Sequence, residues 1–286
     1  MVSICMQGPW SKYTENIIKH YHDIEPQCPI FLCTYDDAPI DILQKLHDTM
    51  GLKYVLLDEK SFVSGERNRN KQRITSFNAL NLAHQNINKQ LHFAVKVRTD
   101  HVLVDKFSKR MMDLIMKYPI NSKLKHGNYI IQNDRIIVCD KHTTLETFWG
   151  SFHIADLFMF GNMYDLLAYW SIDNPFWNKN EDVSILENGI THAYLPAGVV
   201  SPESEFTQLW MKHLRIENFY NEIACLLADR FIVVDLVEYN YHILKDVDTF
   251  CSDTNQIRNL EPPSKIIGDP KIISHEMWKD FYENLS

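Results

Sequence analysis

An arginine and an aspartate that directly follow an apolar run are the residues best placed for chemistry. Residues 93–97 lead into Arg98-Thr99-Asp100, after which apolar residues resume. An open α/β sheet binds ligands at the carboxyl ends of its strands, so a carboxylate there is a candidate ligand for a divalent cation that bridges phosphates. If the strand continues through Asp100, the two side chains share one face and can pair. If the chain turns at Thr99, Asp100 is free to hold Mn or Mg.

Two polar segments are expected close to this strand end. Gln7-Gly8-Pro9 follows the first apolar run, where Gly8 lets the backbone approach a ligand and the Gln7 amide can reach a base or a sugar. A simple turn is the alternative. Asn68, Lys71 and Gln72 open a long helix and share a side of it, and a helix start favours anions. A solvated polar turn is the alternative there.

Two acidic residues farther along are candidate bases. Asp156 and His153 interrupt the aromatic run at 152–160, and a charge inside such a run is costly to bury unless it is paired. An exposed strand end explains both without a function. Glu203 lies in Ser201-Pro202-Glu203 before a helix, where these residue types are ordinary. A carboxylate fixed there can also act as a general base toward an acceptor hydroxyl.

Alternating strands and helices must position these residues. The apolar patterns predict strands over 2–6, 29–35, 53–57 and 92–98, and helices over 14–21, 39–50 and 66–85. This alternation indicates a parallel sheet with right-handed crossovers. The strand ends at Gly8, Asp36, Asp58 and Asp100 should then gather along one edge.

The pattern changes after residue 105, which favours one domain with carboxyl-terminal elaborations. We expect helices over 106–118, 163–170, 203–220 and 221–229, and strands over 135–139, 152–160 and 231–234. Residues 172–200 are expected to be loop-rich and to fold over a pocket. The final segment from residue 261 reads as an irregular tail with a short helix.

Composition narrows the class of protein. The 286 residues suffice for one large α/β domain, and the net charge is -8 with Lys and Arg scattered along the chain. Nonspecific nucleic-acid binding needs a concentrated basic face and is therefore not expected. Six cysteines without a C-x-x-C pair predict buried free thiols in a reducing compartment. Without a signal sequence or an apolar run of about 18 residues, a soluble cytoplasmic protein is expected, with peripheral membrane contact left open.

Five segments in order resemble the WavE family of lipopolysaccharide-synthesis proteins: residues 6–9, 68–72, 96–100, 152–161 and 201–203. The resemblance implies a GT-A-like, Rossmann-like α/β fold and a glycosyltransferase that moves a sugar from a nucleotide-sugar to a glycan or lipid-linked, lipopolysaccharide-type acceptor. A single domain over 1–286 would hold a nucleotide-binding half (1–104), an acceptor half (105–260) and a tail (261–286). Lys71 stands where an arginine is expected, and Arg-Thr-Asp departs from the Asp-x-Asp of many GT-A enzymes.

The resemblance and the residues suggest one mechanism. The base and ribose would lie near Gln7, Gly8 and Asp36, and the diphosphate between Lys71, Arg98 and a Mn or Mg ion on Asp100. Glu203 or Asp156 would deprotonate the acceptor hydroxyl. The expected nucleotide-sugar site comprises Gln7, Gly8, Pro9, Asp36, Asn68, Lys71, Gln72, Arg98 and Asp100.

Two other classes of protein remain open. A sugar-phosphate nucleotidylyltransferase shares the architecture, but it normally begins with a Gly-rich loop carrying Arg and Lys, which Gln7-Gly8-Pro9-Trp10 does not match. A noncatalytic glycan-binding protein would stack sugars on Trp149, Trp170, Trp177 and Trp210. Packing of these tryptophans in the core or in loops is the alternative.

Overall fold

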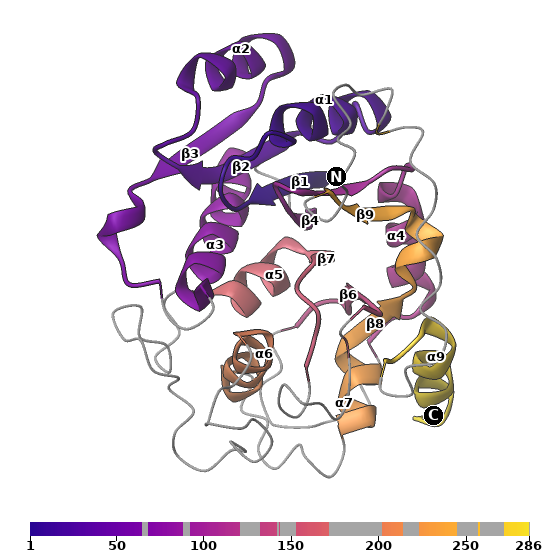
Figure 1. Ribbon diagram of the computed structural model, residues 1–286. Helices are drawn as coiled ribbons and strands as arrows, with labels where there is room; N and C mark the ends of the chain where they lie inside the picture. The colour runs from indigo at the N-terminus through magenta and orange to yellow at the C-terminus, as the bar shows by residue number, and fades with distance from the viewer. Residues whose placement is uncertain are drawn as a thin grey trace.

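A seven-stranded sheet in the order β3-β2-β1-β4-β7-β6-β8 forms the centre of the computed structural model (Figure 1). The structure describes residues 1–64, 68–87, 92–120, 132–141, 143, 153–171, 202–213, 223–244, 257 and 272–285. Only β7 among these strands runs antiparallel to its neighbours. The expected mostly parallel α/β sheet is confirmed. The strands are β1 (Val2–Gln7), β2 (Ile30–Tyr35), β3 (Lys53–Leu57), β4 (Phe93–Arg98), β6 (Ile136–Cys139), β7 (Phe158–Asn162) and β8 (Phe231–Val234).

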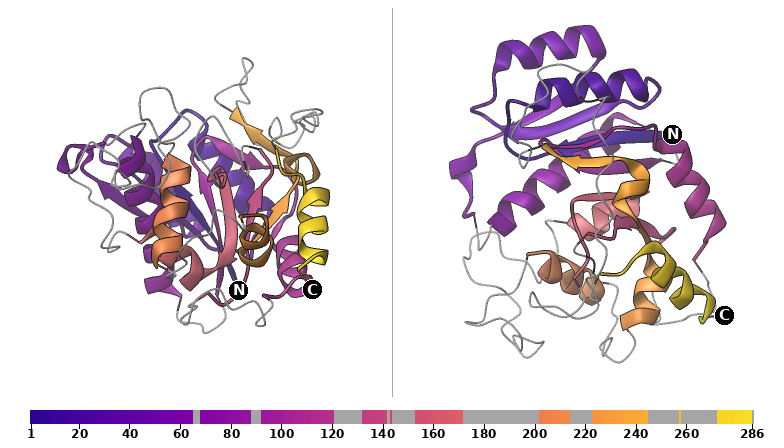
Figure 2. Two further views of the ribbon diagram at one scale, coloured as in Figure 1. Left: turned by 90° about the horizontal axis from the view of Figure 1, so that it is seen from below. Right: turned by 45° about the vertical axis from the view of Figure 1, so that its right-hand side comes forward.

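Helices cover both faces of the sheet. In Figures 1 and 2, α1 (Thr14–Ile24) and α2 (Ile40–Met50) lie on one face, and α3 (Arg69–Asn86) and α5 (Met163–Trp170) on the other. Strands covered on both sides are buried throughout, as β1 and β2 are. The other helical segments are η1 (Glu59–Ser61), α4 (Ser108–Lys117), α6 (Pro202–His213), α7 (Ile223–Arg230), η4 (Leu236–Tyr239) and α9 (His275–Glu283).

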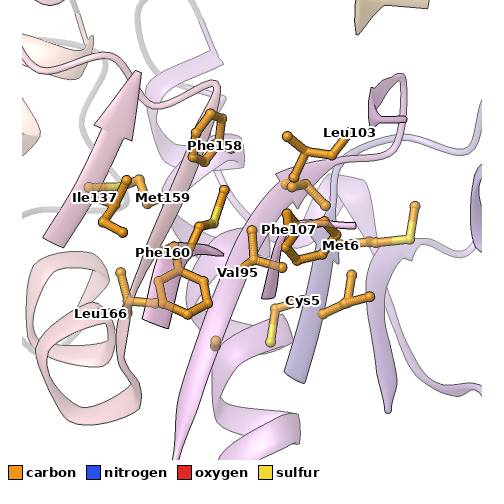
Figure 3. Close-up of a cluster of buried hydrophobic side chains, with 14 of the residues drawn as sticks. Cys5, Met6, Val95, Leu103, Phe107, Ile137, Phe158, Met159, Phe160 and Leu166 are labelled. Carbon is orange, nitrogen blue, oxygen red and sulfur yellow. The ribbon is translucent and has the colours of Figure 1, made fainter. Parts of the chain in front are cut away.

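The hydrophobic core joins the early and the late strands. Figure 3 shows Val95 of β4 between Cys5 and Met6 of β1 and Phe158 and Phe160 of β7. Because β4 pairs with β1 on one side and β7 on the other, it links the two parts of the sheet. The cysteines that the structure describes are free, and four of them are buried, which confirms the expected buried thiols for Cys5, Cys28, Cys33 and Cys139.

Two predicted boundaries were wrong. The strand expected over 152–160 enters the sheet only at Phe158, because the chain before it bends to bring Asp156 to a buried lysine described below. The helix expected from residue 66 begins at Arg69, since Asn68 has a left-handed backbone with φ 62°. Asparagine tolerates that conformation better than most residues. The expected helix over 203–220 corresponds to α6, which the structure describes from Pro202 to His213. The expected loop over 172–200 lies outside the described residues.

A second, two-stranded sheet was not predicted. β5 (His101–Leu103) pairs antiparallel with β9 (Tyr241–Ile243), and His101 and Tyr241 are 140 positions apart in the chain. Strands of three residues carry almost no periodic signal. This small sheet ties the segment after Asp100 to the carboxyl-terminal part of the protein. No helix within the described ranges is long and apolar enough to cross a bilayer.

Candidate functional site

The carboxyl ends of the first four strands meet at one edge of the sheet, as predicted. Gln7 at the end of β1 is in register with Arg98 of β4 and Cys33 of β2, and Tyr35 of β2 is in register with Leu57 of β3. The residues that follow these strands, including Gly8, Asp36 and Asp100, therefore emerge side by side. This edge is where ligands bind in open α/β sheets, and we call it the carboxyl edge.

Arg98 and Asp100 form an ion pair at the carboxyl edge. β4 ends at Arg98 and the chain turns at Thr99 and Asp100, yet the two side chains still meet. Arg98 Nε lies 3.1 Å from Asp100 Oδ1, and Arg98 Nη2 lies 3.4 Å from Asp100 Oδ2. Burial would lower the pKa of Arg98, but the charge and hydrogen bonds of Asp100, together with the charges of Asp156 and Tyr241, raise that pKa on balance. The sequence offered pairing or a turn as alternatives, and the structure contains both.

A histidine lies beside the same carboxylate, at the oxygen that also accepts from Arg98 Nε. His101 Nε2 lies 3.4 Å from Asp100 Oδ1, and His101 Nδ1 is hydrogen-bonded to the Tyr241 hydroxyl. His101 and Tyr241 belong to the paired strands β5 and β9. Asp100 is thus fixed between two nitrogen-bearing side chains.

Lys96 and Asp156 form a buried ion pair on the same side of β4 as Arg98. Lys96 is fully buried, and its Nζ donates hydrogen bonds to the backbone oxygen of Asp156 at 2.6 Å and to its Oδ2 at 3.2 Å. The ammonium also lies 4.6 Å from the centre of the Trp170 ring, a cation–π distance. Burial would raise the pKa of Asp156, but the charges of Lys96 and Arg98 lower it. Asp156 is therefore a buried carboxylate rather than an exposed strand-end residue.

Glu203 contributes a more exposed carboxylate to the same group of charges. It lies in the first turn of α6, and its Oε2 is 3.5 Å from His153 Nε2. Its side chain is 21% exposed, against 3% for Asp156. Burial lowers the pKa of Lys96, while Asp156 and, more weakly, Glu203 raise it. Glu203 is accordingly within electrostatic reach of Lys96. We call Lys96, Arg98, Asp100, Asp156 and Glu203 the charge cluster.

The Gln7-Gly8-Pro9 turn is clamped against the end of β4. The Gln7 side chain is buried, and its Oε1 accepts a hydrogen bond from the Thr75 hydroxyl at 2.6 Å. Thr99 Oγ1 donates to the Pro9 oxygen at 2.7 Å. Gly8 has φ 121°, and a Cβ there would lie 3.2 Å from Thr99 Oγ1, so glycine is required. The structure thus gives Gln7 and Gly8 roles in the turn, and their binding of nucleotide stays a prediction.

The start of α3 exposes Asn68 and buries several of its neighbours. Asn68 is exposed, and Lys71 forms an ion pair with Glu59. Gln72 is partly buried, and Asp36, expected nearby, is exposed after β2. The buried residues of this turn are Arg69, Asn70 and Arg73. Asn68, Lys71, Gln72 and Asp36 remain predicted ligand contacts.

Sequence reasoning missed three members of this region. Lys96 was recognisable, because it is a single cation between Val95 and Val97 in an apolar strand. His101 and Tyr241 had no such signal, since each looks like an ordinary aromatic residue until β5 and β9 pair. Their contribution became visible only in the tertiary structure.

The described residues do not offer a ready metal site. No three His, Cys, Asp or Glu side chains converge within the described ranges to hold a metal ion. Both Asp100 oxygens face the Arg98 guanidinium, and one also faces His101. Divalent Mn or Mg prefers several oxygen ligands, so this nitrogen-rich surrounding does not fit the expected ion.

Two of the tryptophans proposed for sugar stacking are core residues. Trp170 and Trp210 are buried, and the Trp170 ring packs at 5.0 Å from that of Phe206. Neither offers a face to a glycan, so this part of the glycan-binding hypothesis is wrong. Trp149 and Trp177 lie outside the described residues.

The family comparison covers most of the chain. A family model described as WavE lipopolysaccharide synthesis matches residues 2–230. The chain belongs to the WavE lipopolysaccharide synthesis family. The match confirms the resemblance seen in the sequence and includes every residue of the charge cluster. No curated protein matches this WavE family member.

Three solved structures share a distant resemblance with this WavE family member. A putative glucose-1-phosphate thymidylyltransferase from Bacillus anthracis is 8% identical with a TM-score of 0.44, covering 92% of this chain and 98% of its own. A nucleoside-diphosphate-sugar pyrophosphorylase from Vibrio cholerae RC9 is 11% identical with a TM-score of 0.36, covering 63% and 83%. An active-site mutant of LgtC is 9% identical with a TM-score of 0.39, covering 100% and 96%.

Proposed function

We propose that this WavE family protein is a glycosyltransferase that moves a sugar from a nucleotide-sugar to a hydroxyl of a glycan or lipid-linked glycan of the lipopolysaccharide type. Family membership supports synthesis of such a polymer. One structural observation carries the proposal: Arg98, able to bind phosphate, lies two residues after Lys96 on the same side of β4, and Lys96 contacts the Trp170 ring, which packs against Phe206, one turn after the proton acceptor Glu203 on α6. Transfer from a nucleoside diphosphate needs both abilities.

The proposed reaction is a single displacement. The acceptor oxygen forms a bond to the anomeric carbon while the bond from that carbon to the diphosphate oxygen breaks, and the acceptor proton passes to Glu203. The leaving nucleoside diphosphate gains negative charge, which Arg98 and Lys71 stabilise. The base and ribose lie toward Asp36, Pro9 and Asn68. No step of this proposal passes through a metal ion.

Glu203 rather than Asp156 is the proposed base. A base must reach the acceptor hydroxyl within hydrogen-bond distance. Asp156 is buried and its carboxylate already accepts from Lys96, whereas Glu203 is partly exposed at the start of α6. Asp156 then serves as a positioning residue that holds Lys96 in the ion pair.

The first test is a donor panel. The full chain is incubated with UDP-, GDP-, CDP- and dTDP-sugars and a lipopolysaccharide-type acceptor, and nucleotide release is measured. Glu203→Gln should lower kcat about 10²- to 10⁴-fold while donor binding is retained. Glu283→Gln, on the exposed end of α9, is the matched control and should leave kcat unchanged.

Two results would contradict the proposal. One is that no nucleotide-sugar is bound or turned over by the wild type. The other is pyrophosphate release from a nucleoside triphosphate and a sugar 1-phosphate, which would support a nucleotidylyltransferase instead.

A further inference from the structure

We infer that Asp100 is a positioning residue that orients the Arg98 guanidinium for the diphosphate, and that this cation takes the place of a divalent metal at the carboxyl edge. The inference rests on the proposed nucleotide-sugar site. It assigns to Asp100 a contact with Arg98 in place of the metal ligation that Arg-Thr-Asp suggested.

The contact leaves one edge of the guanidinium available. Asp100 accepts hydrogen bonds from Nε and Nη2 of Arg98, so it occupies the Nε–Nη2 edge of the planar guanidinium. Nη1 donates no hydrogen bond to the part of the chain that the structure describes, and the Arg98 side chain is 24% exposed. The Nη1–Nη2 edge therefore presents two parallel N–H donors, which match two phosphate oxygens.

His101 and Tyr241 of the β5–β9 sheet hold the Asp100 carboxylate in its contact with Arg98. His101 contacts Asp100 Oδ1 and is itself bonded to Tyr241, so the carboxylate has little freedom to turn. A preoriented guanidinium loses less conformational entropy when it binds phosphate. The β5–β9 sheet thus supports the position of Arg98 through Asp100.

The same surroundings disfavour a cation on Asp100. A metal ion there would displace Arg98 from one or both oxygens and would lie next to a guanidinium, whose positive charge repels it. The buried Lys96 ammonium belongs to the same side of β4, because Lys96 and Arg98 are alternate residues of that strand. An anionic diphosphate, in contrast, is attracted by the partly exposed Arg98, whereas the charge of Lys96 is balanced by Asp156.

Calorimetric titration of nucleoside diphosphates distinguishes an Asp100 that positions Arg98 from an Asp100 that binds a metal ion. UDP, GDP, CDP and dTDP are titrated into the full chain in EDTA and again in Mn. For the diphosphate that binds most tightly, we expect dissociation constants within about threefold of each other in the two buffers, because one charge-assisted bidentate contact is supplied by the protein.

Variants then test the positioning role. Arg98→Ala should weaken diphosphate binding about 10- to 100-fold but leave binding of the matching nucleoside unchanged. Arg98→Lys should fall between the wild type and Arg98→Ala, because it keeps the charge and loses the fork. Asp100→Asn should weaken diphosphate binding about three- to tenfold in both buffers, and by less than about twofold when Arg98 is already alanine. Asp48→Asn on α2 is the matched control for removal of a carboxylate.

Each outcome decides between the hypotheses. Binding that Mn strengthens at least about tenfold, and that loses this dependence in Asp100→Asn, would overturn the inference while the proposed function stands. An Asp100→Asn variant that binds like the wild type would also overturn it. If the wild type binds none of the four diphosphates in either buffer, the proposed function fails as well. Melting temperatures of all variants identify any that lose the fold, and Arg98→Lys then carries the test in place of Arg98→Ala.

Discussion

At the residue scale, the Lys96–Asp156 pair places two opposite charges in the interior of the protein. Two charges are removed from water, and their attraction offsets that cost only because each has further partners. Lys96 gains a backbone oxygen and the Trp170 ring, and Asp156 lies within reach of Arg98 and His101. Removing one partner would leave the other charge buried alone.

Lys96→Met should therefore lower the free energy of unfolding by about 3–5 kcal/mol at pH 7. The double variant Lys96→Met, Asp156→Leu should recover much of this loss, since no unpaired charge remains. Chemical denaturation of the two single variants, the double variant and the wild type measures the coupling. A double variant that loses as much stability as the two single variants together would show that the pair is not coupled.

The same pair predicts a pH dependence. In the wild type the folded-state pKa of Asp156 is lowered, so its stabilisation is complete above the ordinary value of 3.8 and is lost as the pH falls below it toward the folded-state pKa. In Lys96→Met the unpaired carboxylate is buried, which raises its folded-state pKa. The stability difference between the two proteins should then shrink as the pH is lowered from about 7 toward about 4, and a constant difference would contradict the assignment.

At the element scale, the carboxylate that ends α1 supports the start of α4. No side chain caps α4 from its own N-cap residue, Phe107. Instead Glu25, which is buried, accepts hydrogen bonds from the Phe107 and Ser108 backbone nitrogens and from Ser108 Oγ, each at 2.8 Å. It thereby satisfies free amide groups of the helix and complements the helix dipole from a distant part of the chain.

Glu25→Ala should lower the free energy of unfolding by about 2–3 kcal/mol, because buried amide groups lose a charged acceptor. Glu25→Gln keeps one acceptor oxygen and should lower it by about 1–2 kcal/mol. Thermal and urea denaturation measure both effects. Glu15→Gln, in a surface pair with Lys19 on the same helix, is the control and should change stability by less than about 1 kcal/mol. A Glu25→Ala variant as stable as this control would contradict the capping role.

At the scale of the whole molecule, β4 joins the two parts of the sheet. Its register with β1 runs from Phe93 to Arg98, and its register with β7 runs from Phe93 to Val97. Without β7, β4 would become an edge strand that exposes a long row of unpaired backbone groups and apolar side chains. Such edges promote aggregation.

We therefore expect the isolated segment 1–104 to be insoluble or to self-associate, although it contains four parallel strands. Size-exclusion chromatography and binding of a hydrophobic dye compare it with the full chain. A monomeric, dye-free fragment with cooperative unfolding would show that the first half folds independently and would contradict the role given to β4.

Much of the first half of the fold could be predicted from its sequence. The apolar runs that became β1 to β4 are separated by helices with recognisable ends, such as the left-handed Gly51 that ends α2. The site was predicted less completely. Arg98 and Asp100 stand out because they follow a strand. No local pattern shows that the Gln7 side chain is hydrogen-bonded to Thr75, and a contact of Gln7 with a nucleotide stays a prediction.

Local sequence patterns are enough to predict the parallel strands, the edge at which they end and the family. These follow from local periodicity and from short segments in order. The tertiary structure alone decided that Asp100 faces Arg98 and His101, that Asp156 pairs with Lys96, and that Glu203 is the more exposed carboxylate. The physical reason is that the partner of a buried charge is fixed by packing between distant segments, 60 positions apart for Lys96 and Asp156, which no local pattern records.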